Sequence, residues 1–127
     1  MEFFLPAVEL VAQPSVLLAI LFGTVIGTIV GVLPGLGPVV AITVCLPFTF
    51  SMGQIPAIAL MLSVYCTSTY GGSISAVLIN TPGTPASAAT CLDGFPMTKR
   101  GKADRALGWV TIASVIGGLF SVVVLIF

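Results

Sequence analysis

Long apolar runs separated by two Pro-Gly segments dominate this chain. Residues 15–33 (SVLLAILFGTVIGTIVGVL) are long enough for one helix to cross the roughly 30 Å hydrocarbon core of a bilayer. Residues 39–50 are as apolar but only about a dozen long, which favours a half-helix or a re-entrant segment. Residues 55–79 and 106–127 form two further long runs. The pattern predicts an all-α membrane protein, with transmembrane helices and broken or re-entrant segments at two Pro-Gly motifs.

Shorter segments connect these runs. Residues 1–14 predict an interfacial lead, and Pro14 can open the first long helix. Residues 51–54 (SMGQ) predict a turn, and residues 86–92 predict a short helix. A polar loop is expected at 93–105 (DGFPMTKRGKADR).

Three glycines fall four residues apart in the first long run: Gly23, Gly27 and Gly31. At this spacing they share one helix face, and small residues in lipid let another helix approach closely. We expect this face to pack against a second helix. The alternative is that glycine is simply frequent in membrane helices.

The first break is LPGLGP at 33–38. Pro34 cannot continue a helix, and Gly35 and Gly37 permit backbone angles that other residues resist. Pro38 suits the first position of a new helix, where its missing N–H costs nothing.

The second break is NTPGTP at 80–85 and has the same order of residues. A helix meets Pro82-Gly83 and stops, and Pro85 suits the start of the next one. Thr84 precedes Pro85 and is a suitable N-cap.

In hydrocarbon every backbone N–H and C=O needs a partner, so irregular backbone is tolerated only inside protein or along a cavity. The N–H groups after each second proline, at 40–42 and 87–89, are expected to point into the breaks and attract an anion. Carbonyls before the breaks are candidates for a small cation such as Na⁺. The alternative is a pair of tight turns at the membrane surface.

The positions of the charged residues limit which groups of this chain can bind an anionic ligand. Only 6% of the residues are charged, none lies between Leu10 and Leu92, and the net charge is zero, which shows no footprint for nucleic acid. Because no Lys or Arg precedes Lys99, an anionic ligand must be held here by N–H dipoles, by hydroxyls or through a co-bound cation.

All four basic residues lie in the 93–105 loop, which predicts that this loop is cytoplasmic. If 39–50 is re-entrant, parity places the N-terminus inside as well. If 39–50 spans the membrane, or if 71–92 folds back, the parity reverses.

Enzymatic chemistry is not indicated. The chain has no histidine, and its four acidic residues lie in peripheral segments, so no acid–base pair is visible. The cysteines Cys45, Cys66 and Cys91 are widely spaced in apolar surroundings, so we interpret them as packing residues and predict no metal site and no cofactor.

Two stretches, 31–50 (GVLPGLGPVVAITVCLPFTF) and 70–108 (YGGSISAVLINTPGTPASAATCLDGFPMTKRGKADRALG), resemble the large membrane subunit of tripartite tricarboxylate transporters, the TctA family. The resemblance runs from about Val16 to Phe127. It implies that residues 1–127 form the N-terminal part of a longer permease with two related halves.

The family resemblance also implies a function. Such subunits are multi-pass proteins of the bacterial inner membrane that import citrate or related carboxylates, coupled to Na⁺ or H⁺. A periplasmic solute-binding protein and a small membrane subunit are the implied partners, besides the lipid bilayer and the carboxylate substrate.

Carried over residue by residue, the first family motif falls on Pro34, Gly35, Leu36, Gly37 and Pro38. The second falls on Tyr70, Gly71, Gly72, Ser73, Asn80, Thr81, Pro82, Gly83, Thr84 and Pro85. We predict ligand contact from the backbone of Gly35, Leu36 and Gly37 and from Asn80, Thr81, Gly83 and Thr84. Asp93 and Gly94 begin the loop of the resemblance, and Asp93 is either a cation or proton site or part of an Asp-Gly turn.

Two other classes remain open. A structural or assembly subunit would use the breaks as turns and the Gly23/Gly27/Gly31 face as a dimer contact. A passive channel would use carbonyl rings to select ions, but that requires a repetition which this chain does not show.

Overall fold

The computed structural model describes residues 4–127, and every regular element within them is a helix. Three of these helices are long and apolar enough to cross a membrane, namely α2, α4 and α6, whereas α3 is shorter at 13 residues. The predicted all-α architecture is confirmed. The elements are α1 (Phe4–Val11), α2 (Pro14–Val32), α3 (Gly37–Thr49), α4 (Gln54–Ile79), the 3₁₀ turn η1 (Pro85–Ser87), α5 (Ala88–Lys99) and α6 (Ala103–Ile126).

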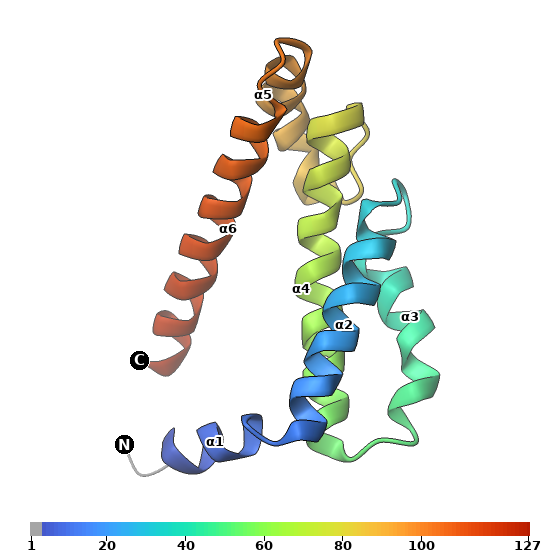
Figure 1. Cartoon of the computed structure of the whole chain (residues 1–127), viewed down its shortest axis with the longest axis vertical. Helices are drawn as coiled ribbons and strands as arrows, with labels where there is room; N and C mark the ends of the chain where they lie inside the picture. The colour runs from blue at the N-terminus through green and yellow to red at the C-terminus, as the bar shows by residue number, and fades with distance from the viewer. Residues whose placement is uncertain (1–3) are drawn as a thin grey trace.

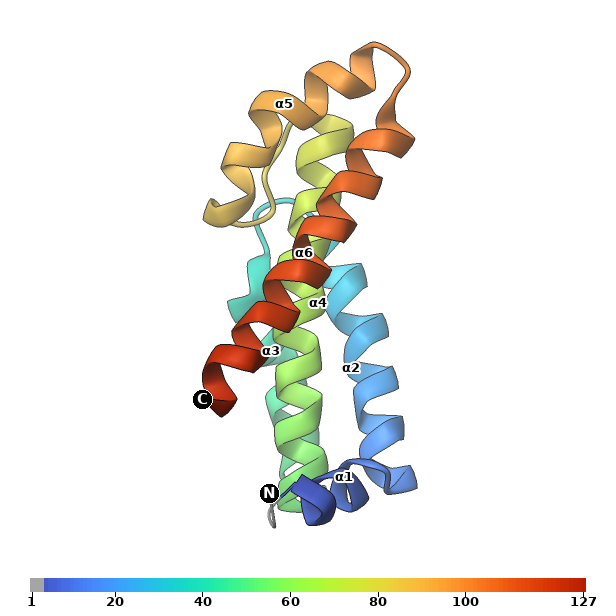
Figure 2. The ribbon, with the colours of Figure 1, turned by 90° about the vertical axis from the view of Figure 1, so that its left-hand side faces the viewer.

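Helices α2, α3 and α4 run alternately up and down beside one another (Figure 1). Helix α1 lies across one end of this group, α5 lies at the other end, and α6 returns at an angle to α4 (Figure 2). The predicted boundaries hold closely: Pro14 opens α2, and the chain turns between Thr49 and Gln54.

Helix α3 returns to the end of the molecule at which α2 begins (Figure 1). Helix α1 and the α5–α6 turn therefore lie at opposite ends. The sequence left two arrangements open, and this path corresponds to the second, in which 39–50 runs from one end of the molecule to the other. Its 13 helical residues cover about 20 Å, and the following loop completes the distance. The side of the membrane on which each end lies stays a prediction.

The α2–α4 contact is a glycine seam. Gly23, Gly27 and Gly31 are all buried, and a methyl group at Gly31 would overlap the backbone of Ser68. The Thr67 hydroxyl adds a hydrogen bond to the Gly23 carbonyl at 3.3 Å. Close packing at this glycine face is confirmed, and its occupant is α4 of the same chain.

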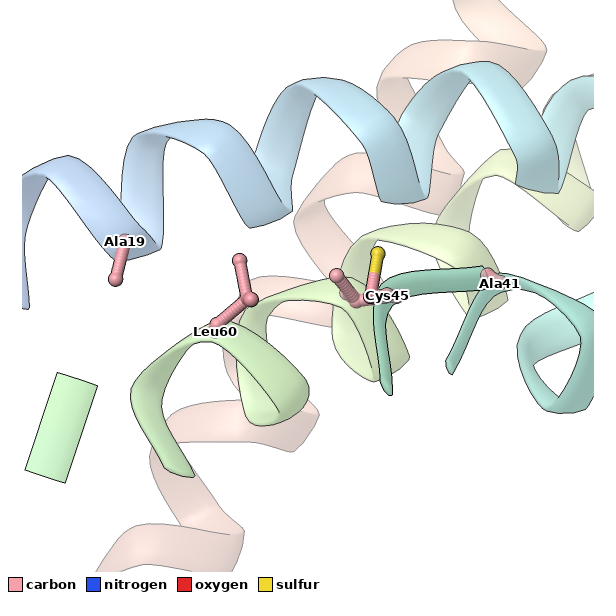
Figure 3. Packing of buried hydrophobic residues seen from close by; sticks show 5 residues of the cluster. Ala19, Ala41, Cys45 and Leu60 are labelled. Carbon is pink, nitrogen blue, oxygen red and sulfur yellow. The ribbon is translucent and has the colours of Figure 1, made fainter. Parts of the chain in front are cut away.

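The apolar core lies where α2, α3 and α4 meet. Figure 3 shows Ala19 of α2, Ala41 and Cys45 of α3, and Leu60 of α4 gathered between the helices, and Val64 completes the cluster. Of the three cysteines, Cys45 has the predicted packing role, whereas Cys66 is exposed.

The predicted 93–105 loop is largely helical, because α5 continues to Lys99. Gly94 is buried, and a methyl group there would lie 2.8 Å from Val77 Cγ2. The Thr98 hydroxyl donates to the Val77 carbonyl at 2.7 Å. These contacts hold α5 against α4, so the interpretation of Asp93-Gly94 as a turn is wrong.

Replacing Gly31 with alanine should destabilise the folded protein by about 1–3 kcal/mol, because the added methyl group meets the Ser68 backbone and α2 must move away from α4. SDS titration in mixed micelles, followed by helicity, measures this change. Gly117→Ala is the matched control, since nothing lies within 4 Å of that position and both variants gain the same helix propensity. Equal stability of the two variants would contradict the glycine seam.

Candidate ligand pocket at the two chain breaks

The first break is a tight glycine turn between α2 and α3. The Leu36 N–H donates to the Leu33 carbonyl at 3.4 Å. Gly35 and Gly37 have φ of 86° and 62°, in the left-handed region that favours glycine. Helix α3 begins at Gly37, one residue before the predicted start at Pro38.

The second break folds back along α4. Helix α4 ends at Ile79, and Asn80 follows with φ of 56°. The chain then reverses, so that the Gly83 N–H donates to the Gly72 carbonyl at 3.3 Å. Because Gly72 lies seven residues before the end of α4, this segment returns about 10 Å along the helix.

Three glycines make this close approach possible. A methyl group at Gly83 would lie 2.6 Å from the Cα of Gly72 and 2.8 Å from the carbonyl oxygen of Gly31. Only hydrogen side chains fit where the backbones of α2, α4 and the second break meet. The motif glycine Gly71 also belongs to this contact, because a methyl group there would lie 2.9 Å from the backbone of Gly31.

Thr84 and Ser87 form a buried capping box around η1. The Ser87 N–H donates to Thr84 Oγ1 at 3.2 Å, and the Thr84 N–H donates to Ser87 Oγ at 3.1 Å. The predicted N-cap at Thr84 and helix start at Pro85 are confirmed. Both hydroxyls are nearly inaccessible to solvent, so the box fixes the shape of the second break from within.

Because of the capping box, fewer backbone N–H groups are free at the second break than the sequence predicts. The N–H groups of Ser87 and Ala88 have partners in Thr84 and Pro85, so the prediction that they point unpaired into the break is wrong. In α3, which begins at Gly37, the N–H groups without a partner inside the helix are those of Gly37 and Val39, because Pro38 between them has no N–H. The predicted groups at 40–42 follow this turn and are not among them.

The two breaks, almost fifty residues apart in sequence, meet at one pocket of about 450 Å³. Figures 1 and 2 show the α2–α3 turn beside the segment that precedes α5, and a methyl group at Gly37 would lie 3.5 Å from the Gly83 carbonyl oxygen. The lining residues are Gly35, Leu36, Gly37, Pro38, Val39, Tyr65, Thr69, Gly83, Thr84, Pro85 and Ala86.

The lining contains no Lys, Arg, Asp or Glu. Its polar groups are backbone groups of the two breaks, the buried Thr84 hydroxyl, and two hydroxyls of α4, those of Tyr65 and Thr69. The Thr69 hydroxyl donates to the Tyr65 carbonyl at 2.9 Å and can still accept a hydrogen bond. Two other hollows, of about 430 and 420 Å³, are lined almost entirely by apolar side chains and have little to offer a polar ligand.

Tyr65 and Thr69 were not among the predicted site residues. They lie one helical turn apart on α4. Their spacing of four residues was the available signal, but it did not identify which face of α4 meets the breaks.

Other predicted residues lie outside the pocket lining. Asn80 and Thr81 are exposed at the end of α4, where the Thr81 hydroxyl donates to the Ile79 carbonyl at 3.3 Å. The Tyr70 hydroxyl lies 2.7 Å from Thr111 Oγ1 and joins α4 to α6. Seven more motif residues are also absent from the lining: Pro34, Gly71, Gly72, Ser73, Pro82, Asp93 and Gly94.

The sequence of this chain is similar to that of a known family of membrane transporters. The sequence profile of the "Tripartite tricarboxylate transporter TctA family" matches residues 17–127. A protein of Agrobacterium vitis, described as an uncharacterized 52.8 kDa protein in the TAR-I ttuC' 3'region, is 36% identical over 89 residues. The aligned part is 70% of this chain but only 18% of that relative. No solved structure matches the chain.

Removing the Thr84 hydroxyl should loosen the second break. Thr84→Val removes the side-chain acceptor of the buried Ser87 N–H, which keeps only the Thr84 carbonyl at 3.1 Å, at a cost of about 1 kcal/mol. Hydrogen–deuterium exchange should then become faster in the peptide that covers residues 80–92. Thr43→Val is the control, since that exposed hydroxyl bonds only the Val39 carbonyl of its own helix. Unchanged exchange in Thr84→Val would refute the structural role of the box.

Proposed function

This chain belongs to the tripartite tricarboxylate transporter TctA family, and we propose that it forms part of the large permease subunit of a secondary transporter. The transporter imports tricarboxylates or related carboxylates across the bacterial inner membrane and is driven by a Na⁺ or H⁺ gradient. The observation that supports this proposal best is the meeting of two Pro-Gly breaks at one pocket that has polar backbone but no fixed charge.

A carboxylate fits the chemistry of this pocket. Unpaired N–H groups at the start of α3 carry partial positive charge, which favours an anion. Gly35 and Gly37 have no side chain to keep a ligand from the backbone, and Tyr65 offers a hydroxyl donor from α4. We propose ligand contact at the backbone of Gly35, Leu36, Gly37 and Gly83, with Thr84 shaping the wall.

A cation that binds together with such a ligand would balance its negative charge. A tricarboxylate carries several negative charges, and the pocket lining has no Lys or Arg to balance them. Unwound backbone in transporters supplies carbonyl oxygens to Na⁺ beside the half-helix ends that hold the anion. We propose that the coupling ion binds with the substrate, so that the pair crosses the membrane with less net charge.

The proposed orientation places the basic α5–α6 turn in the cytoplasm. Because α1 and the α3–α4 turn lie at the opposite end, they face the periplasm in this orientation (Figure 1). A periplasmic solute-binding protein would then deliver substrate to that end. The small membrane subunit would pack elsewhere on the apolar surface.

The breaks are proposed to lie below the membrane surface. Gly83 rests on Gly72, about 10 Å along α4 from the end of that helix. A simple turn at the membrane surface would not run back along α4 in this way. The rival assembly role loses its dimer contact as well, because the face of Gly23, Gly27 and Gly31 is already covered by α4.

Tyr65→Phe should raise the KM for uptake roughly tenfold, since a hydrogen bond to a charged ligand is lost. Tyr70→Phe is the matched control: it removes one hydroxyl from the same helix, but that hydroxyl bonds Thr111 outside the pocket lining. Uptake of radiolabelled citrate by cells with the complete transporter measures both. Equal KM values for the two variants would argue against the pocket.

The double variant Asn80→Leu/Thr81→Val tests the other predicted contacts. If these exposed side chains touch the substrate at any stage of transport, KM rises in this variant too. An unchanged KM would remove both residues from the proposed site and leave the pocket lining intact.

Cation coupling has a direct test in proteoliposomes that contain the complete transporter. An inward Na⁺ or H⁺ gradient should accumulate the carboxylate above its external concentration. An ionophore that collapses the effective gradient should return the internal concentration to equilibrium. Uptake that only equilibrates under both gradients would contradict the proposed coupling.

A further inference from the structure

The corner between α5 and α6 concentrates the positive charge of the chain. It holds all four basic residues within seven positions, and all four are exposed. Figure 2 shows this corner at the end of the molecule opposite α1. The Lys99 ammonium lies 4.9 Å from the centre of the Phe95 ring, which holds it over α5. The basic residues are Lys99, Arg100, Lys102 and Arg105.

An apolar stripe continues from this corner along α6. Arg105 and Trp109 are one helical turn apart and therefore share a face. Ile112 and Ile116 follow on the same face at helical spacing, and the exposed fractions from Trp109 onward are 67%, 51% and 62%. One helix face thus presents a cation, then an amphipathic indole, then a hydrocarbon surface.

We propose that this face binds an anionic phospholipid, with the headgroup at the basic corner and an acyl chain along α6. The charge selects a headgroup with net negative charge, and the apolar stripe selects the acyl chain attached to it. A soluble anion would use the first feature but not the second. An indole at this level is typical of the membrane interface, where its ring and its N–H meet different surroundings. Clusters of basic residues beside a membrane helix attract anionic lipids at about fivefold in affinity per residue.

The chain contains a reporter for this site, because Trp109 is its only tryptophan. The chain is reconstituted into nanodiscs with equal mole fractions of acyl-brominated phosphatidylglycerol or acyl-brominated phosphatidylcholine. Bromine quenches indole fluorescence on contact. We expect the anionic lipid to quench Trp109 about twofold or more strongly than the zwitterionic lipid.

Variants separate charge recognition from fold. In K99Q/R100Q/K102Q/R105Q the quenching ratio should fall to one. Arg105→Lys keeps the charge and should keep the preference. Glu9→Gln changes a charge in α1, at the opposite end of the molecule, and should leave the ratio at the wild-type value. If the quadruple variant does not insert, Arg105→Gln alone should still lower the ratio.

Two results would overturn the proposal. One is equal quenching by both lipids in the unmodified chain. The other is loss of the preference when inorganic phosphate is added, which would assign the corner to soluble anions. A ratio that survives phosphate and depends on the basic residues supports the lipid site, whatever the outcome of the transport experiments.

Discussion

Backbone-to-backbone contact between glycines is the interaction on which the rest of this structure depends. Gly31 of α2 lies directly on the backbone of Ser68, and Gly71 of α4 lies on Gly31. With α2 and α4 this close, the end of α2 leaves a space that only another glycine segment can enter. Gly83 occupies it, bonded to Gly72. The pocket follows from this packing, because the same contact brings the second break beside the first.

Much of the helical layout could be predicted from the sequence alone. The long apolar runs specify α2, α4 and α6, and Pro14, Thr84 and Pro85 mark helix starts for reasons local to each residue. Predictions from local sequence were wrong where contacts between helices determine the structure. Asp93-Gly94 is typical of a turn, yet Gly94 is needed in α5 so that this helix can lie on Val77. The orientation stayed open for a similar reason, since parity depends on how far 37–49 travels and not on its composition.

The two breaks that form the pocket could each be predicted from the sequence, but their meeting could not. Each break signals irregular backbone through its own prolines and glycines, but no local rule says that residues 35–37 and 83–85 meet. Tyr65 and Thr69 show the same limit, because their role depends on which face of α4 the breaks cover. Which backbone N–H groups are free could also be learned only from the structure. The Thr84–Ser87 capping box pairs N–H groups that the first turn of a helix usually leaves without a partner.

The absence of fixed charge from the pocket lining has a physical consequence for a carrier. A lysine or arginine in such a site would hold a carboxylate strongly in a low dielectric, and its own charge would be costly to bury whenever the site was empty. Backbone dipoles avoid both problems, because they are neutral as a group and stay bonded or solvated without the ligand. In the proposed function, the affinity that they lack comes from a cation that arrives and departs with the substrate. The basic residues are instead gathered at the α5–α6 corner, where their charge can orient the helices without holding the cargo.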